Sequence, residues 1–259
     1  MTRHETFATL DIAEKDLVLA TDLDGTFLGG SQEDRDQFYD WINTNRHRVG
    51  LIFVTGRDPG FITAQVRKGL PDPDYVIGDV GTTIARFGAD RQVDPIAELE
   101  AEIAAGWGDA TNSVDVALRR FPGLKLQSGL FRHRASFDMD PHNFHPEAVK
   151  VVEEMGFDAL ISDDRFFDVL PKGVSKGPSL LRLLSHLGIQ NSRTLVAGDT
   201  LNDLSMLELG LPAVAVGGSE QALIEKVKGL DHLHCAEGVG VSGIAEAILH
   251  FDFFKKSNA

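Results

Sequence analysis

Residues 17–26, LVLATDLDGT, combine a short apolar run with two closely spaced carboxylates. The apolar residues 17–20 predict a buried strand, and Asp22 and Asp24 follow it directly. In an extended segment, residues two positions apart point the same way, so both carboxylates can address one site before Gly25 permits a sharp turn. One carboxylate can attack as a nucleophile while the other transfers a proton. The alternative, an acidic turn exposed to solvent, does not account for the buried strand directly before the two carboxylates.

Similar apolar runs recur along the chain and alternate with helical patterns. Strands are expected at 17–20, 49–54, 75–77, 194–197 and 213–216, and helices at 31–42, from 58 to before 71, and at 178–187. This alternation predicts an α/β fold with a doubly wound parallel sheet, whose ligands bind at the carboxyl ends of the strands.

The texture of the sequence changes between residues 92 and 170. Helical patterns at 96–105 and 146–155 mix there with strands of polar alternation at 131–138 and 165–170. We therefore expect a catalytic core made of residues 1–91 and 171–259, interrupted by an inserted α/β cap domain at 92–170.

Composition excludes several classes of protein. The 259 residues carry a formal net charge of −14, which disfavours nonspecific binding to nucleic acid or to anionic membranes. No apolar run approaches the roughly 20 residues that span a bilayer, and residues 1–16 do not resemble a signal peptide. The single Cys235 suits a reducing compartment. We expect a cytoplasmic protein that takes a small-molecule substrate.

Two further features suit a phosphate group. Thr55, Gly56 and Arg57 follow the second expected strand, where a hydroxyl and backbone amides can bind phosphate oxygens. Lys176 stands at the start of a helix, where the helix dipole disfavours a cation, so it needs another partner such as phosphate or the attacking carboxylate. Each feature by itself is also explained by a surface loop or a surface lysine.

A second pair of carboxylates follows the strand expected at 194–197. The segment 198–203, GDTLND, places Asp199 and Asp203 there, together with Asn202, a candidate substrate ligand. Mg²⁺ prefers hard oxygen ligands and keeps waters and substrate phosphate, so Asp22, Asp199 and the backbone near Asp24 would hold it, with Asp203 in support. An Asx-rich helix cap explains one of these residues but not both acids.

The ordered set of motifs resembles the haloacid dehalogenase superfamily. The resemblance rests on Asp22 and Asp24, then Thr55, then Lys176, then Asp199 and Asp203, and it spans most of the chain. It implies that Asp22 is the nucleophile, Asp24 the general acid and base, and Thr55 and Lys176 phosphate ligands. It also implies Mg²⁺ as the cofactor, held at Asp22, Asp24, Asp199 and Asp203.

The stretches 73–83, 167–177 and 198–203 resemble the branch that contains sucrose phosphatase and mannosylfructose-phosphate phosphatase. This resemblance implies hydrolysis of a disaccharide or glycoside phosphate, with Lys172, Arg132 and His133 as candidate sugar contacts. The sequence departs from that branch at Leu201, where sucrose phosphatases carry glycine, and at Gly25, where several carry asparagine. The departures affect the expected sugar and not the expected reaction.

Two rival functions stay open. A phosphomannomutase-like mutase shares the expected core and a similar cap, and a non-catalytic phospho-aspartate signalling module also combines acids, a threonine and a lysine. The cap and Asp24 argue against the second. The glycines of a GxGxxG pattern at 238–243 are followed by too few residues for a dinucleotide fold, and the histidines at 133, 142, 145, 232 and 234 match no zinc spacing.

Overall fold

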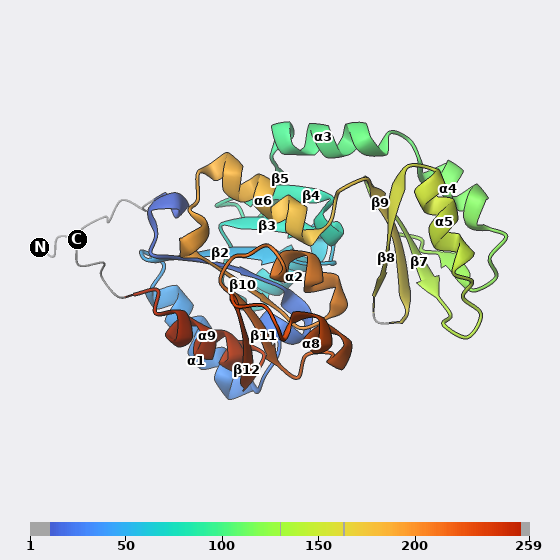
Figure 1. Ribbon diagram of the computed structural model, residues 1–259. Coiled ribbons are helices and arrows are strands. Elements are labelled where there is room, and N and C mark those ends of the chain that lie inside the picture. Colours follow the sequence, from blue (N-terminus) through green and yellow to red (C-terminus); the bar gives the residue numbers. More distant parts are fainter. Residues whose placement is uncertain (1–10, 130, 163, 255–259) are drawn as a thin grey trace, which may run out of the picture.

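Two sheets organise the part of the chain that the structure describes, which is residues 11–129, 131–162 and 164–254 of a computed structural model (Figure 1). The larger sheet contains, in spatial order, β12 (Leu233–Val239), β11 (Ala213–Gly217), β10 (Thr194–Gly198), β1 (Leu17–Thr21), β2 (Val49–Val54), β3 (Tyr75–Gly78), β4 (Thr83–Phe87) and β5 (Val93–Pro95). The smaller sheet contains β6 (Leu124–Leu126), β7 (Ala135–Met139), β9 (Phe166–Pro171) and β8 (Phe157–Ser162).

The larger sheet is parallel from β12 to β3 and antiparallel at β4 and β5. Each of the five strands expected from apolar runs lies in its parallel part and begins at the expected residue. The prediction of a parallel-sheet α/β core is therefore confirmed. The antiparallel strands β4 and β5 extend the sheet beyond the predicted set.

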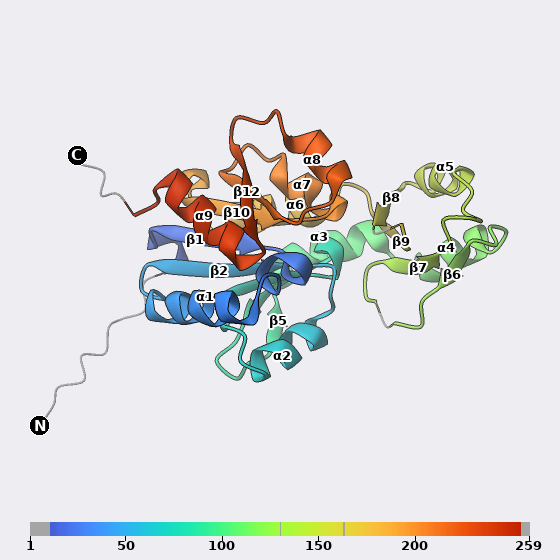
Figure 2. The ribbon, with the colours of Figure 1, turned by 90° about the horizontal axis from the view of Figure 1, so that it is seen from below.

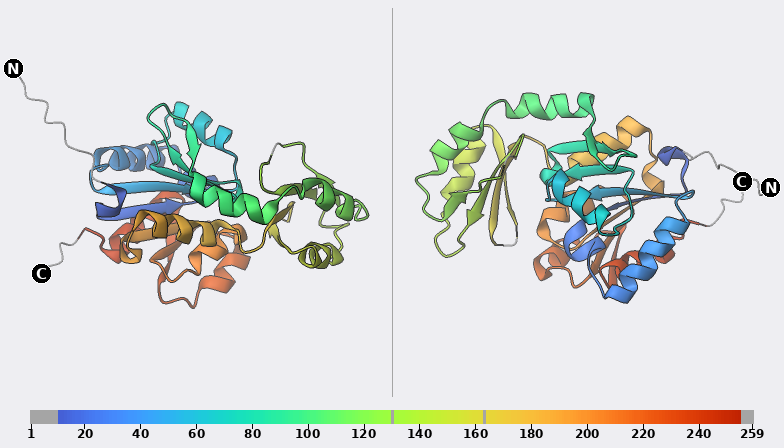
Figure 3. Two further views of the ribbon diagram at one scale, coloured as in Figure 1. Left: turned by 90° about the horizontal axis from the view of Figure 1, so that it is seen from above. Right: turned by 180° about the vertical axis from the view of Figure 1, so that it is seen from behind.

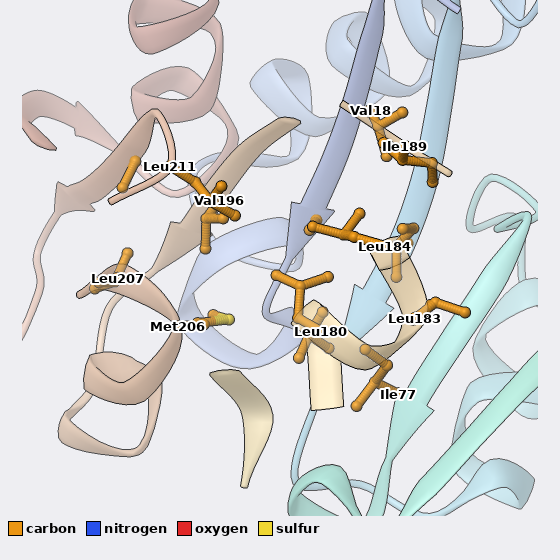
Figure 4. Close-up of a cluster of buried hydrophobic side chains, with 14 of the residues drawn as sticks. Val18, Ile77, Leu180, Leu183, Leu184, Ile189, Val196, Met206, Leu207 and Leu211 are labelled. Carbon is orange, nitrogen blue, oxygen red and sulfur yellow. The ribbon is translucent and has the colours of Figure 1, made fainter. Parts of the chain in front are cut away.

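Helices cover both faces of the larger sheet (Figures 1 and 2). Along β1, Val18 and Ala20 contribute to the apolar cluster on one face, and Leu17 and Leu19 to the cluster on the other. The first cluster, shown in part in Figure 4, is completed by α6 (Lys176–Leu187), α7 (Leu204–Leu207) and α8 (Gln221–Val227). The second is completed by α1 (Gln32–Thr44), α2 (Pro59–Arg67) and α9 (Val241–Phe251).

The helix ends follow their capping residues. Ser31 and Asp34 form the capping box at the start of α1, and the Asp58 side chain accepts hydrogen bonds from the first amides of α2. Helix α6 ends at Gly188 in the left-handed conformation, as expected, but begins at Lys176 rather than at Pro178. The earlier start places Lys176 within the helix and fixes its direction.

The smaller sheet forms the cap with α4 (Thr111–Leu118) and α5 (Glu147–Glu154), which pack on one of its faces. Figure 3 shows the cap standing beside the core and joined to it by α3 (Ala97–Trp107) and by the connection from β9 to α6. Helix α3 belongs to both parts, because Leu99 and Ile103 lie in a core cluster whereas Trp107 lies in the cap cluster.

The start of the insertion differs from the expected boundary at residue 92. Strand β5 (Val93–Pro95) pairs with β4 in the larger sheet, so these residues lie in the core. The reason is a tight turn, in which Gly88 N donates to Gln92 O at 2.8 Å and returns the chain along the edge of the sheet. At its other end, β9 carries the cap sheet through Pro171, next to the expected boundary at 170 and 171.

The glycines at 238–243 serve close packing. Strand β12 and α9 come so close that a Cβ on Gly243 would lie 2.3 Å from Gly238 O.

Among the described residues, no helix has the length and apolar character that spanning a membrane requires.

Candidate active site

The expected motifs meet at the carboxyl edge of the larger sheet. Strands β1 and β10 are neighbours, and Asp22 N donates to Ala197 O at 2.9 Å, which fixes the start of the Asp22 loop against the end of β10. Asp199 follows β10 and Thr55 follows β2, on the two sides of β1. Segments more than 140 residues apart in the sequence thus converge because parallel strands end at one edge.

Lys176 is a fully buried cation that joins these segments. Its Nζ donates at 2.7 Å to Asp22 Oδ1, to Asn202 Oδ1 and to Asp203 Oδ1, so the three protons of the ammonium group are all used. Burial lowers the pKa of Lys176, but the carboxylates of Asp203 and Asp22 outweigh it and raise that pKa above its ordinary value. Lys176 therefore stays charged beside the expected nucleophile.

Asp22, Asp199 and Asp203 can offer carboxylate oxygens that lie within 4.8 Å of one another. Lys176 pairs with two of these three carboxylates, so a divalent cation bound among their oxygens would add positive charge where acidic groups are in excess. Burial raises the pKa of Asp199 to about 7, so a cation beside it would favour its charged form. The residues present thus fit Mg²⁺, for which hard oxygen ligands are required.

Asp203 is already occupied by protein groups. Its Oδ1 accepts from Lys176, and its Oδ2 accepts from the backbone amides of Asp199 and Thr200 at 2.9 and 3.0 Å. The carboxylate therefore shapes the 199–203 loop and orients Asp199, the supporting role expected for it beside a metal ion.

Asp24 lies apart from the three clustered carboxylates and is paired with Arg57. Arg57 Nε donates to Asp24 Oδ2 at 2.8 Å and Nη2 donates to Oδ1 at 3.0 Å, a bidentate pair that is about half exposed on both sides. Both side chains line the cavity described next, so Asp24 faces the space where a leaving group would lie.

Gly25 is required by this arrangement. Its φ is +81°, and a Cβ at this position would lie 2.1 Å from Asp199 Oδ2. A side chain here would displace a carboxylate of the acidic cluster or change the turn. The departure at Gly25 therefore belongs to a turn whose backbone comes close to Asp199, and the next residue, Thr26, donates its hydroxyl to Asp199 Oδ1 at 2.6 Å.

A cavity of about 280 Å³ lies above the acidic cluster, between core and cap. The core contributes Asp22, Asp24, Gly56, Arg57, Asp58, Val80, Thr200 and Asn202. The cap contributes Gln127, Phe131, Arg134, Ser136, Ser162, Phe166 and Asp168. One wall thus carries the expected chemistry and the other presents hydroxyl, amide, carboxylate and aromatic groups suited to a small polar ligand.

The remaining predicted residues divide into two groups. Gly56, Arg57 and Asn202 line the cavity, and Thr55 is buried beside it with its Oγ1 accepting from Arg57 N at 3.2 Å. The three expected sugar contacts, Arg132, His133 and Lys172, are not among the residues that line the cavity. Arg132 is paired with Glu100, Lys172 is exposed and paired with Asp158, and His133 is partly buried with its Nε2 unpartnered among the described residues.

Gln127 and Arg134 belong to a segment whose polar groups could be expected to face the active site, and both line the cavity, but sequence reasoning missed Ser136, Ser162 and Asp168. The signal was the alternation along β7 and β9, where Ala135, Phe137, Phe167 and Val169 lie in the cap cluster and the polar residues between them face the other way. The alternation identifies the polar face of the cap sheet, but it does not show that this face lies opposite the core.

Comparisons with known proteins agree with this geometry. Residues 15–252 match the family model described as Sucrose-6F-phosphate phosphohydrolase. The chain is 29% identical over 248 residues to a mannosylfructose-phosphate phosphatase of Agrobacterium fabrum, covering 90% of this chain and 96% of the relative. It is 39% identical over 243 residues to a glucosylglycerol-phosphate synthase of Pseudomonas anguilliseptica, covering 93% of this chain but only 31% of the synthase.

Among solved structures, the sucrose-phosphatase of Synechocystis sp. PCC6803 in complex with sucrose and phosphate superposes with a TM-score of 0.83. The sequence identity is 26%, and the alignment covers 93% of this chain and 100% of the other. The resemblance expected from the motifs is confirmed. Because the family model spans most of both the core and the cap, the chain belongs to the sucrose-6F-phosphate phosphohydrolase family of haloacid dehalogenase-type phosphatases.

Proposed function

We propose that this protein is a Mg²⁺-dependent phosphatase of small glycoside phosphates that works through a phosphorylated Asp22. The observation that carries the proposal is the position of Asp22 on the cavity wall, bonded to Lys176 and within reach of Asp199 and Asp203. A carboxylate held beside a buried cation is placed to attack an anionic phosphate that would otherwise repel it.

In the first half of the proposed cycle, an Asp22 carboxylate oxygen attacks phosphorus in line and the bond from phosphorus to the sugar oxygen breaks. Asp24 gives its proton to the departing oxygen. In the second half, Asp24 takes a proton from water, the water oxygen attacks phosphorus, and the acylphosphate bond breaks. Inorganic phosphate leaves and Asp22 is restored as a carboxylate.

Arg57 has a part in this exchange. Its guanidinium donates hydrogen bonds to both oxygens of Asp24. A phosphate dianion arriving beside the 55–57 loop competes for the same guanidinium. Once Arg57 turns to the phosphate, Asp24 is free to carry the proton for the leaving group.

Asp22 and Asp199, oriented by Asp203, would hold Mg²⁺, which supplies charge neutralisation for the transferring phosphoryl group. Lys176 and the backbone amides of the 55–57 loop act on the same charge from the protein side. The cap excludes water from the leaving group while the phosphate is transferred.

Two classes of glycoside phosphate are candidate substrates. Disaccharide phosphates of the sucrose 6-phosphate or mannosylfructose phosphate type are suggested by the names of the family and of one relative. A smaller glycoside phosphate, glucosylglycerol phosphate, is suggested by the name of the synthase and by a cavity of about 280 Å³, which is at the lower end of the usual range for ligand pockets, roughly 300–1,000 Å³.

The test is a comparison of kcat/KM for disaccharide phosphates, glucosylglycerol phosphate, hexose 6-phosphates and phosphoglycolate under identical conditions. The proposal expects a glycoside phosphate to rank first by at least about tenfold, since polar contacts in the cap discriminate among leaving groups. Hexose phosphates ranking first, or equal values for every ester, would contradict it.

The same assay separates the rival functions. Release of inorganic phosphate without an isomerised sugar phosphate excludes a mutase. Repeated turnover with a simple ester excludes a signalling module, which acquires one phosphoryl group and releases it slowly.

A cytoplasmic location stays a prediction.

A further inference from the structure

One cation of the cap is buried where the cap meets the core. Arg134 immediately precedes β7, and its side chain is only 6% exposed. Its Nη1 donates to Asp168 Oδ1 of the cap at 3.1 Å, and its Nη2 donates to Asp79 Oδ1 and Gly56 O of the core at 3.3 and 3.2 Å. The guanidinium therefore bridges the two parts of the molecule.

The core partners of Arg134 support the 55–57 loop. Asp79 N donates to Arg57 O at 3.0 Å, and Val80 N donates to Thr55 O at 3.2 Å. Asp79 and Val80 have φ values of 52° and 60°, which side chains rarely adopt and β-branched ones least of all, so surrounding contacts must hold this turn. A bond to Asp79 consequently acts on the turn that braces the expected phosphate loop.

The cap partner of Arg134 belongs to the cavity wall. Asp168 in β9 and Ser136 in β7 are directly paired across the smaller sheet, and the Ser136 hydroxyl donates to the same Asp168 oxygen as Arg134 does. Both side chains line the cavity. The bridge thus connects the face of the cap that would meet the leaving group with the loop that would meet the phosphate.

The energetics of burial favour a role in positioning over a role in permanent closure. Arg134 lies 4.0 Å from the centre of the Phe131 ring, and its Nε has no hydrogen-bond partner among the described residues. Desolvation offsets much of the attraction within a buried ion pair, so the bridge adds less to stability than its number of contacts suggests. Such a bridge fixes one geometry of closure without preventing the cap from opening.

We infer that Arg134 is a positioning residue that couples closure of the cap to the 55–57 loop. Its contacts with Asp79 and Gly56 set the cap wall at a fixed position above Asp22, which aligns the leaving group for in-line attack. The kinetic consequence rests on the proposed function, whereas the consequence for the position of the cap does not.

The position of the cap is measured first. The native Cys235, exposed on β12 of the core, takes one spin label, and Val116→Cys on α4 of the cap, 65% exposed in the native protein, takes the second. In this labelled background, Arg134→Met is expected to broaden the distance distribution and shift it to longer distances. The control is Arg119→Met, which removes another cap arginine paired with an aspartate, Asp115, on an exposed helix face.

A distribution for Arg134→Met that coincides with those of the parent and the control overturns the inference. Asp79→Asn is the second variant, for the case in which Arg134→Met does not fold. It removes the charged core partner and leaves the Arg134 and Asp168 pair in the cap, and asparagine tolerates the left-handed backbone at this position. A shift with Asp79→Asn supports the bridge, and its absence contradicts it.

The kinetic test compares two esters. Arg134→Met is expected to lower kcat/KM for the preferred glycoside phosphate about 10²-fold through misalignment, and to lower kcat/KM for p-nitrophenyl phosphate at least about tenfold less, because only the support of the 55–57 loop is lost there. Arg134→Lys should restore little, because a lysine cannot span Asp168 and Asp79 with a fork of donors. Equal losses with both esters contradict a positioning role. If the parent hydrolyses no glycoside phosphate, the proposed function fails and the distance measurement alone decides the bridge.

Discussion

Lys176 and Arg134 are two of the buried cations in the described part of the chain, and each has carboxylate partners that are arranged differently in the fold. Each lies between two carboxylates: Asp22 and Asp203 for Lys176, and Asp79 and Asp168 for Arg134. All partners of Lys176 belong to the core, held by the ends of β1 and β10 and the start of α6. The partners of Arg134 are divided between the core and the cap.

The difference separates a cation that holds one site together within the core from a cation that joins the core to the cap. A compact ammonium group suits a site where three fixed acceptors and an incoming phosphate converge. A planar guanidinium suits a joint, because its separate donors can hold two parts in one relative geometry. Changes around Lys176 should therefore affect the chemistry with every ester, and changes around Arg134 should depend on the leaving group.

The largest expected effect is at the Lys176 centre. Asp22→Asn should lower turnover of every phosphate ester by on the order of 10⁴-fold or more, since an amide is a poor nucleophile and a weaker ligand for Mg²⁺. The fold should persist, because the amide oxygen can still accept from Lys176 Nζ. Steady-state phosphate release checks the loss, and activity within tenfold of the parent would remove Asp22 from the nucleophile role.

Removal of the metal ion should affect the acidic cluster beside Lys176 but not the Arg134 bridge, and this test needs no mutation. Thorough chelation is expected to abolish turnover and Mg²⁺ to restore it, while Ca²⁺ inhibits because it takes more ligands at longer distances. The distance between spin labels on core and cap should stay the same, because no carboxylate that pairs with Arg134 belongs to the acidic cluster. Undiminished turnover in the chelated protein would contradict the proposed cofactor.

Asp24→Asn should reduce turnover by roughly 10² to 10⁴, the usual contribution of general acid and base catalysis. The loss should be smaller for p-nitrophenyl phosphate than for a glycoside phosphate, because nitrophenolate leaves readily without a proton. Full activity with both esters would mean that another group transfers the proton.

Stability should also distinguish the Lys176 centre from surface lysines. Lys176→Met leaves Asp22 and Asp203 buried without their cation and should cost about 3–5 kcal/mol in the free energy of unfolding. The control is Lys172→Met, an exposed lysine in the connection before α6 that is paired with Asp158, for which we expect no measurable change. Urea denaturation checks both, and equal midpoints would contradict the structural part of the role of Lys176.

The smallest effect is expected at Asp168. Asp168→Asn keeps an acceptor for Arg134 and Ser136 but removes the negative charge of that acceptor, which weakens the two hydrogen bonds by about 1 kcal/mol. We expect kcat/KM to fall a few-fold for the preferred glycoside phosphate and to stay unchanged for p-nitrophenyl phosphate. A loss as large as that of Asp24→Asn would assign Asp168 to the chemistry.

The parallel core and the convergence of Asp22, Asp199 and Thr55 could be predicted from the sequence, because both follow from local rules. Apolar runs of strand length alternate with capped helices, and parallel strands bring the residues after them to one edge. Lys176 was singled out because a cation at a helix start lacks a local partner, and its place in the ordered set of motifs distinguished it from a surface lysine. Spacing and residue type carried these inferences without any knowledge of contacts.

Only the tertiary structure decided the cap side of the cavity. Arg132 and Arg134 are basic residues of the insertion and Lys172 follows it directly, yet Arg134 alone of the three is buried against the core. The choice depends on how the smaller sheet is oriented over the larger one, and on the antiparallel pair β4 and β5 with the Asp79 turn before them. Such long-range packing leaves no periodic trace in the sequence, because the alternation along a strand defines two faces without naming the surface that each one meets.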